Sequence, residues 1–222
     1  DSTGFENVVS NVTAKGTSLD IGNNKENPLA VNLDFSVPIE GGYEITTING
    51  LFEKNLSVVR FISPPKLKEL KYDRFRFCSN LKEIRLNDGL TTIGTQVFRD
   101  CPIEGELYLP KTLTAIGSSS FNSPGIVGKI IWPENCPEFN GLIYTSIDTF
   151  IGNGIKSLSN NCLAHNSYLT NVVLSTCLET IKGGDWFDYS YCNLDVYWRS
   201  FPANGFAKNP MGGHLYSNTI TN

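Results

Sequence analysis

The sequence predicts an α/β solenoid, a right-handed superhelix of about seven turns in which each turn of ~23 residues adds one strand to a parallel β-sheet. Three observations support this prediction. Apolar residues in 81–98 follow irregular spacings that fit neither one amphipathic helix nor one half-buried strand. Residues 105–121 repeat these spacings, and an aromatic residue recurs near the end of successive copies. Such a segment cannot bury its own apolar face, so its copies must stack on one another.

The chain divides into three predicted parts. Residues 1–42 lie outside the repeat and are rich in Asn, Ser, Gly and Asp, with an alternating apolar stretch, so we expect a strand-containing N-terminal cap. Residues 43–198 hold seven copies of the repeat and form the solenoid. Residues 199–222 contain too much Gly, Pro and Asn for another regular copy, so we expect an irregular C-terminal cap.

Each copy supplies two inward positions on its strand, and stacking aligns them into two buried columns. The first predicted column consists of Ile84, Leu107, Ile130, Val172 and Val196. The second consists of Leu86, Leu109, Trp132, Ile151, Leu174 and Trp198. We assign Ile151 as the equivalent of Trp132, 19 residues later, and therefore take that copy to be shorter than the others.

A third predicted column lies at the far end of each copy, where aromatic rings fill the wide side of the turn. It consists of Phe52, Phe75, Phe98, Phe121 and Tyr144. Gly94 and Gly117 each follow an Ile of the pattern directly. A glycine at this place suits a bend or a close approach of two backbones.

The repeat resembles the BspA-like leucine-rich repeats, the type first described in treponemal surface proteins. The matching stretches read LKEIRLNDGLTTIGTQVFRDC and GELYLPKTLTAIGSSSF, against the family pattern LxxIxLPxxLxxIGxxxFxxC. The resemblance implies a superhelix of the leucine-rich-repeat type. It also implies a secreted or surface-anchored protein of a host-associated bacterium, which acts as an adhesion or binding module rather than as an enzyme.

Composition and charge restrict the classes of partner. The chain has 222 residues, a formal net charge of −4 and no long run of either sign, so we expect no nucleic-acid partner. No stretch approaches the ~20 apolar residues of a membrane span. The chain begins at Asp1 rather than at Met. We expect a monomer that is exported, with a lipid anchor in a segment upstream of Asp1.

Sequence motifs for catalysis and metal binding are missing. His165 and His214 stand in no zinc spacing, and His165 is expected to be a surface-loop residue. No GxSxG, GxxxxGK or GxGxxG motif occurs. We therefore predict no catalytic residue, no metal and no cofactor.

One group of residues keeps an enzymatic alternative open. Three carboxylates lie near aromatic residues, a composition that glycosidases also use, so the chain is alternatively an enzyme or enzyme-accessory domain acting on polysaccharide. The residues are Asp185, Asp188 and Asp195 with Trp186, Tyr189 and Tyr191.

The cysteines are predicted to be buried free thiols. Cys78 and Cys101 occupy one repeat position, three residues after Phe75 and Phe98, where a small buried side chain fits. A disulfide between Cys78 and Cys101 is the alternative, because equivalent sites on adjacent turns lie close enough to bridge.

The candidate binding site is the outward position of each strand, between the two inward positions. Side chains alternate between the faces of a strand, so these residues are expected one above another on the open sheet face. They are Arg85, Tyr108, Ile131, Phe150, Val173 and Tyr197. Five of the six are apolar or aromatic, and a contiguous exposed apolar patch often marks a contact surface.

We therefore predict an extracellular or cell-surface adhesion module that binds a protein or glycan, such as host matrix, through this face. Changes at the loop residues Asp88 and Lys111 are expected to affect binding little. Other accounts stay open. The apolar residues of the column could reflect strand propensity alone, or the caps could fold over the face. The solenoid could also be a passive spacer for another domain.

Overall fold

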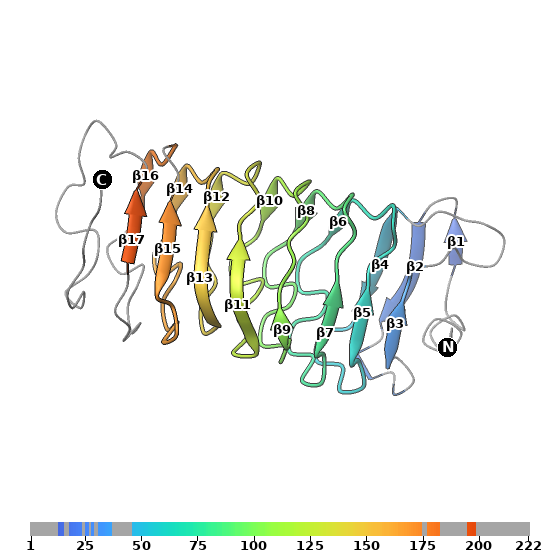
Figure 1. The fold of residues 1–222 in the computed structure, drawn as a ribbon. Coiled ribbons are helices and arrows are strands. Elements are labelled where there is room, and N and C mark those ends of the chain that lie inside the picture. The colour runs from blue at the N-terminus through green and yellow to red at the C-terminus, as the bar shows by residue number, and fades with distance from the viewer. Residues whose placement is uncertain are drawn as a thin grey trace.

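The computed structural model describes residues 13–15, 18–23, 25–26, 28, 31–36, 46–174, 177–182 and 195–198. These residues form an elongated solenoid in which each turn contributes one strand to each of two rows (Figure 1). Five complete turns, from β5 to β15, lie wholly within the described residues. The predicted parallel-strand solenoid is confirmed, whereas the predicted count of about seven turns includes turns that extend into residues not described.

The first row carries the candidate binding face. Its strands are β3 (Asn32–Asp34), β5 (Arg60–Ile62), β7 (Glu83–Arg85), β9 (Gly105–Glu106), β11 (Ile126–Ile131), β13 (Ser146–Gly152), β15 (Asn171–Leu174) and β17 (Asp195–Trp198). They pair in parallel as two sheets, one ordered β3-β5-β7 and the other β9-β11-β13-β15-β17. The division of the chain at residues 42 and 198 stays a prediction.

The second row consists mostly of two-residue strands. They are β2 (Ser18–Asn23), β4 (Thr47–Leu51), β6 (Glu69–Leu70), β8 (Thr92–Ile93), β10 (Ala115–Ile116), β12 (Glu138–Phe139), β14 (Ser157–Leu158) and β16 (Thr180–Ile181). β2 pairs in parallel with β4 and antiparallel with β1 (Thr13–Lys15). The remaining strands form two parallel three-stranded sheets, β6-β8-β10 and β12-β14-β16.

A run of turns leads from the second row back to the first, and the described residues contain no helix. The α component of the predicted α/β class is therefore wrong for this part of the chain. Each run bonds to the next, as where the Phe98 N–H donates to the Ser120 carbonyl over 3.0 Å. Residues with a left-handed backbone conformation, which cannot continue a right-handed helix, flank the buried Phe75 and Phe98. They are Asp73 (φ 56°), Phe77 (φ 59°), Gln96 (φ 57°) and Asp100 (φ 57°).

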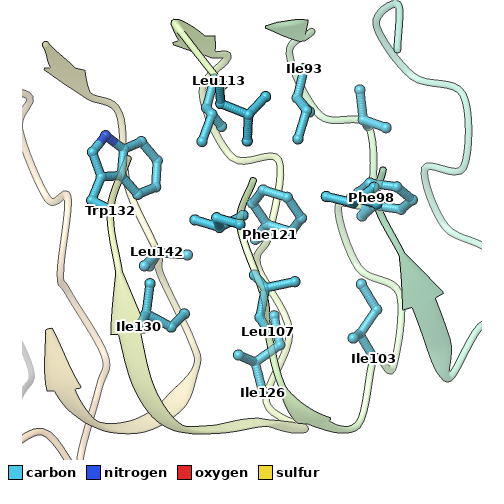
Figure 2. Packing of buried hydrophobic residues seen from close by; sticks show 14 of the residues in the cluster. Ile93, Phe98, Ile103, Leu107, Leu113, Phe121, Ile126, Ile130, Trp132 and Leu142 are labelled. Atoms are coloured by element: carbon cyan, nitrogen blue, oxygen red, sulfur yellow. The ribbon is translucent and has the colours of Figure 1, made fainter. Parts of the chain in front are cut away.

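The aromatic column is confirmed for its first four members. Successive rings of Phe52, Phe75, Phe98 and Phe121 stack with centroids 5.2, 5.4 and 5.6 Å apart, and all four side chains are buried. Figure 2 shows Phe98 and Phe121 between neighbouring layers of aliphatic side chains. These stacked rings occupy the wide side of the turn and join one turn to the next.

Tyr144, the fifth predicted member, does not belong to the column. Its side chain is 55% exposed, and Leu142 is buried instead. The Tyr144 ring stacks on His165 of the next turn, with centroids 4.2 Å apart. His165, predicted in a surface loop, is thus a half-buried residue with a defined ring contact.

The close backbone approach predicted at Gly117 is confirmed. A Cβ placed on Gly117 would lie 2.3 Å from the Thr95 nitrogen in the preceding turn, a distance that no real Cβ adopts. The equivalent Cβ on Gly94 would lie 2.6 Å from the Tyr72 nitrogen. Consecutive turns are therefore in contact through their backbones at this place, which only glycine permits.

The two inward columns are largely confirmed. Leu107, Ile130 and Val172 of the first column are buried and Ile84 is partly buried. Leu86, Leu109, Trp132 and Leu174 of the second column are buried. The side chains of Val196 and Trp198 lie outside the described part of the structure.

Ile151 and Phe150 are exchanged relative to the prediction. Gly128 pairs with Ile147, a step of 19 residues, but a register shift follows, and Lys129 pairs with Thr149, a step of 20. Phe150 therefore pairs with Ile130 on the inward side, and its side chain is fully buried. A one-residue slip moves a side chain to the opposite face of a strand, so the prediction that Phe150 is exposed and Ile151 inward is wrong.

The physical reason for the inward Phe150 is a change in what fills the core. In the later turns Leu142 and Leu163 are buried, and no described phenylalanine continues the stacked column beyond Phe121. Phe150 supplies the missing volume, since its ring lies 4.5 Å from that of Phe139. The Trp132 ring packs on Phe139 at 4.6 Å and completes this second aromatic cluster.

Free thiols are confirmed at five of the six cysteines. Cys78, Cys101, Cys136 and Cys162 are buried as predicted, and none of the five forms a disulfide. Cys177 is exposed, so the prediction of burial is wrong for this residue. The Cys101 thiol donates to the Phe75 carbonyl over 2.8 Å, so the alternative of a Cys78–Cys101 bridge does not describe this structure. Cys192 lies outside the described residues.

Alkylation of the native protein at about pH 8 is expected to modify Cys177 and to spare the four buried cysteines. Burial blocks access, and it also raises the pKa of Cys136 to about 11 and raises the pKa values of Cys101 and Cys162, so little reactive thiolate forms. Peptide mass spectrometry measures the modified sites. Alkylation in urea is the control and should reach every cysteine, whereas native modification of Cys162 at the rate of Cys177 would contradict this assignment.

The candidate binding face

The outward column of the first row is exposed where the repeat is most regular. Tyr108 is 60% exposed and Ile131 is 52% exposed, and Arg85 is exposed beside them. Val173 is partly buried. Tyr197 pairs with Val173 through β17, but its side chain is not described. The structure thus places Tyr108 and Ile131 together as the exposed apolar centre of this face.

Among the described side chains of the predicted outward column, only that of Phe150 is removed from the face, since it is fully buried. Ile131 pairs with Ile151, which in turn pairs with Val173, so Ile151 continues the outward column. Its side chain is partly buried rather than open. This position of the face therefore carries the aliphatic side chain of Ile151 rather than the predicted aromatic ring of Phe150.

Two grooves flank Tyr108, because strand pairing is interrupted there. β9 pairs with β11 only through Gly105 and Glu106, and among the described strands no ladder pair joins β7 to β9. One groove, of about 520 Å³, lies between β9 and β11 and is called the β9–β11 groove. The other, of about 450 Å³, lies between β7 and β9. Glu106 and Tyr108 line both grooves and form the ridge between them.

The Tyr108 side chain is held by a hydrogen bond from the preceding turn. Its hydroxyl donates to Asp88 Oδ1 over 2.9 Å, and this bond raises the pKa of Tyr108. Lys111 lines the β9–β11 groove. Asp88 and Lys111 therefore both lie at the face. The expectation that changes at these two residues affect binding little stays a prediction, and neither residue serves as a neutral control. No sequence signal indicated the contact between Asp88 and Tyr108, which are 20 residues apart.

The charged groups of the face differ between its two ends. On the β7 side, Glu83 lies between two arginines, with Oε2 3.2 Å from Arg60 Nε and Oε1 2.8 Å from Arg85 Nε. On the β9–β11 side, the exposed side chains of Glu106 and Lys129 make no hydrogen bond or ion pair with any described residue. Groups without a partner are available to a ligand.

Glu106 and Lys129 are absent from the predicted site, although a signal for them existed. Each lies two residues before an outward residue, Tyr108 and Ile131 respectively, and alternation along a strand places such residues on the same face. Residues two positions apart on one face form a second column beside the first. This column carries charge where the first carries apolar surface.

Of the acidic and aromatic group, residues 185–191 lie outside the described residues, and only the backbone of Asp195 is described. Among the described residues, no group of three or more His, Cys, Asp and Glu side chains is arranged to hold a metal ion. The described residues also include no helix that is long and apolar enough to cross a membrane.

The stacked strands and the repeated core positions define a solenoid protein of the leucine-rich-repeat class. Residues 46–143 match the model of the BspA type leucine rich repeat region in six copies. This part of the chain is therefore a BspA-type leucine-rich repeat region, which confirms the resemblance found in the sequence.

The chain is similar to a solved leucine-rich repeat structure. It is the crystal structure, at 1.19 Å resolution, of a leucine-rich repeat protein from Bacteroides ovatus. The two chains are 15% identical and superpose with a TM-score of 0.40 over 86% of this chain and 70% of the other. No curated protein matches the chain.

Proposed function

We propose that this chain is a non-enzymatic binding module of an extracellular or cell-surface protein, which recognises a protein or glycan partner through the first-row face. The observation that carries the proposal is the exposed pair Tyr108 and Ile131, at 60% and 52%, with Val127 of the same strand as Ile131 also exposed. Exposed apolar patches rimmed by polar residues often mark contact surfaces. Arg85, Val173 and Tyr197 extend the proposed binding column on either side of this pair.

The proposed setting follows from the family of the repeat. BspA-type repeats are typical of surface proteins, and host matrix is the proposed class of partner. A lipid anchor upstream of Asp1 and a monomeric state belong to the same proposal. Export would bring the first-row face into contact with extracellular proteins and glycans.

Replacing Tyr108 and Ile131 together with serine is expected to reduce partner binding by about tenfold or more. Both side chains are exposed, so the double variant should keep the fold of the parent. Binding is measured by biolayer interferometry against immobilised host matrix proteins and by detecting labelled protein bound to a glycan array. Far-UV circular dichroism and melting temperature report the fold.

The matched control changes two equally exposed apolar residues that lie away from the first row. Leu56 and Tyr72 are 68% and 66% exposed. Their double replacement with serine should leave binding within about twofold of the parent. Parental binding by the Tyr108 and Ile131 variant, or equal losses in both variants, would refute the role of the first-row face.

A further inference from the structure

The β9–β11 groove has the dimensions and exposure of a small-ligand site. Its volume of about 520 Å³ lies within the range of 300 to 1,000 Å³ that is usual for such sites. Leu107 and Trp132, both buried, contribute to its lining beneath the exposed Tyr108 and Ile131. A stable protein–protein contact buries about 1,200 to 2,000 Å², far more than this pair of exposed apolar side chains offers.

One wall of the groove is an oriented aromatic ring. The hydrogen bond to Asp88 holds the tip of the Tyr108 side chain, and the ring remains 60% exposed. An aromatic ring held in place loses little conformational entropy when a ligand packs against it. Tyr108 is thus a preformed stacking surface with Ile131 opposite.

The polar groups around the groove are balanced in charge. Two carboxylates and two ammonium groups line it, from Glu106, Glu134, Lys111 and Lys129, together with the amide of Asn135. None of these side chains bonds to any described residue. Burying them beneath a wholly apolar ligand would leave their hydrogen-bonding capacity unsatisfied. The balance of charge suits a ligand that is neutral but rich in donors and acceptors.

We propose that the β9–β11 groove binds a neutral oligosaccharide, an inference that rests on the proposed binding function of the first-row face. A sugar ring has one apolar face and a rim of hydroxyl groups. The apolar face packs against Tyr108, and the hydroxyl groups bond to Glu106 and Lys129. A ligand of this kind matches both the aromatic wall and the zero net charge of the side chains that line the groove.

Isothermal titration calorimetry with cellotetraose, maltotetraose, xylotetraose, chitotetraose and mannotetraose tests this inference. At least one of these should bind at ligand concentrations up to about 10 mM. Its affinity should change by less than about twofold between about 50 mM and about 500 mM NaCl, because salt screens interactions between charges and the ligand has none.

Substitutions at Tyr108 test the position of the ligand. Tyr108→Ala should weaken binding by about tenfold or more, and Tyr108→Phe, which keeps the ring but loses the bond to Asp88, by less. Glu106→Gln keeps a hydrogen-bond acceptor, so its loss of affinity should lie between those of Tyr108→Ala and Tyr108→Phe. Tyr72→Ala, which removes an equally exposed tyrosine outside the first row, is the matched control and should bind like the parent.

The possible failures separate the inference from the proposed function. If no neutral tetrasaccharide binds, or if binding survives Tyr108→Ala, the oligosaccharide site is refuted. If only anionic glycans bind, with an affinity that falls in salt, the inference is also refuted. A matrix protein whose binding depends on Tyr108 and Ile131, with no sugar binding, would refute the inference and leave the proposed function standing.

Discussion

Replacing Phe98 with alanine is expected to lower the free energy of unfolding by about 3 to 5 kcal/mol. The Phe98 side chain is fully buried and its ring stacks on Phe75 at 5.4 Å and on Phe121 at 5.6 Å. It also lies 6.3 Å from the ring of Phe61 on the first row. Alanine would leave a cavity between three turns, because the backbone bonds that hold those turns prevent them from closing on it. Urea unfolding followed by circular dichroism measures the loss.

Two further variants calibrate this result. Phe98→Leu should cost less than Phe98→Ala, because leucine at 142 and at 163 is fully buried in later turns. Tyr72→Ala removes an exposed aromatic residue and should change the free energy of unfolding by no more than about 0.5 kcal/mol. A loss below about 1 kcal/mol for Phe98→Ala would mean that the column does not hold the turns together.

Replacing Asn166 with alanine is expected to destabilise the protein by about 3 kcal/mol or more. The Asn166 side chain is fully buried and bonds to two turns at once. Its Oδ1 accepts from the Thr145 N–H at 2.8 Å, and its Nδ2 donates to the carbonyls of Leu142 at 2.7 Å and Leu163 at 2.8 Å. Alanine would leave these buried backbone groups without this partner, at about 1 to 3 kcal/mol for each group left unsatisfied.

The same unfolding measurement with two other variants tests the explanation. Asn166→Asp keeps the acceptor for Thr145 but loses the donor and buries a charge, so it should not restore stability. Asn135→Ala changes an exposed asparagine whose side chain has no described partner, and should cost no more than about 0.5 kcal/mol. Parental stability of Asn166→Asp would contradict the importance of the donated bonds.

The repeat itself was predictable from the sequence because its spacing is constant in the central copies. Between Ile93 and Ile116 the step is ~23 residues, and the structure aligns these two residues in adjacent strands. The same spacing located the stacked phenylalanines and the close approach at Gly117. The spacing could not predict that the described segments leading from the second row to the first contain no helix. Residues with positive φ interrupt these segments, and Phe77 and Gln96 are not among the residue types that usually adopt positive φ.

The exposure of the residues in the outward column was predicted correctly only as far as the spacing held. Tyr108 and Ile131 lie in regular copies and are exposed as expected. Phe150 lies beyond the register shift between Gly128 and Lys129, and one residue of error was sufficient to reverse its face. A short copy reveals that residues are missing, but not where along the strand the register changes.

The sequence by itself determined that this chain is a stack of short turns, because no single copy can bury its apolar side chains alone and the constant period aligns them between copies. The tertiary structure alone decided which side chains reach the open face and where that face is hollowed. Phe150 points inward because the core of the later turns needs its volume, and the grooves beside Tyr108 exist because strand pairing stops at Glu106. Both outcomes depend on the register between neighbouring turns, which packing and hydrogen bonding set together.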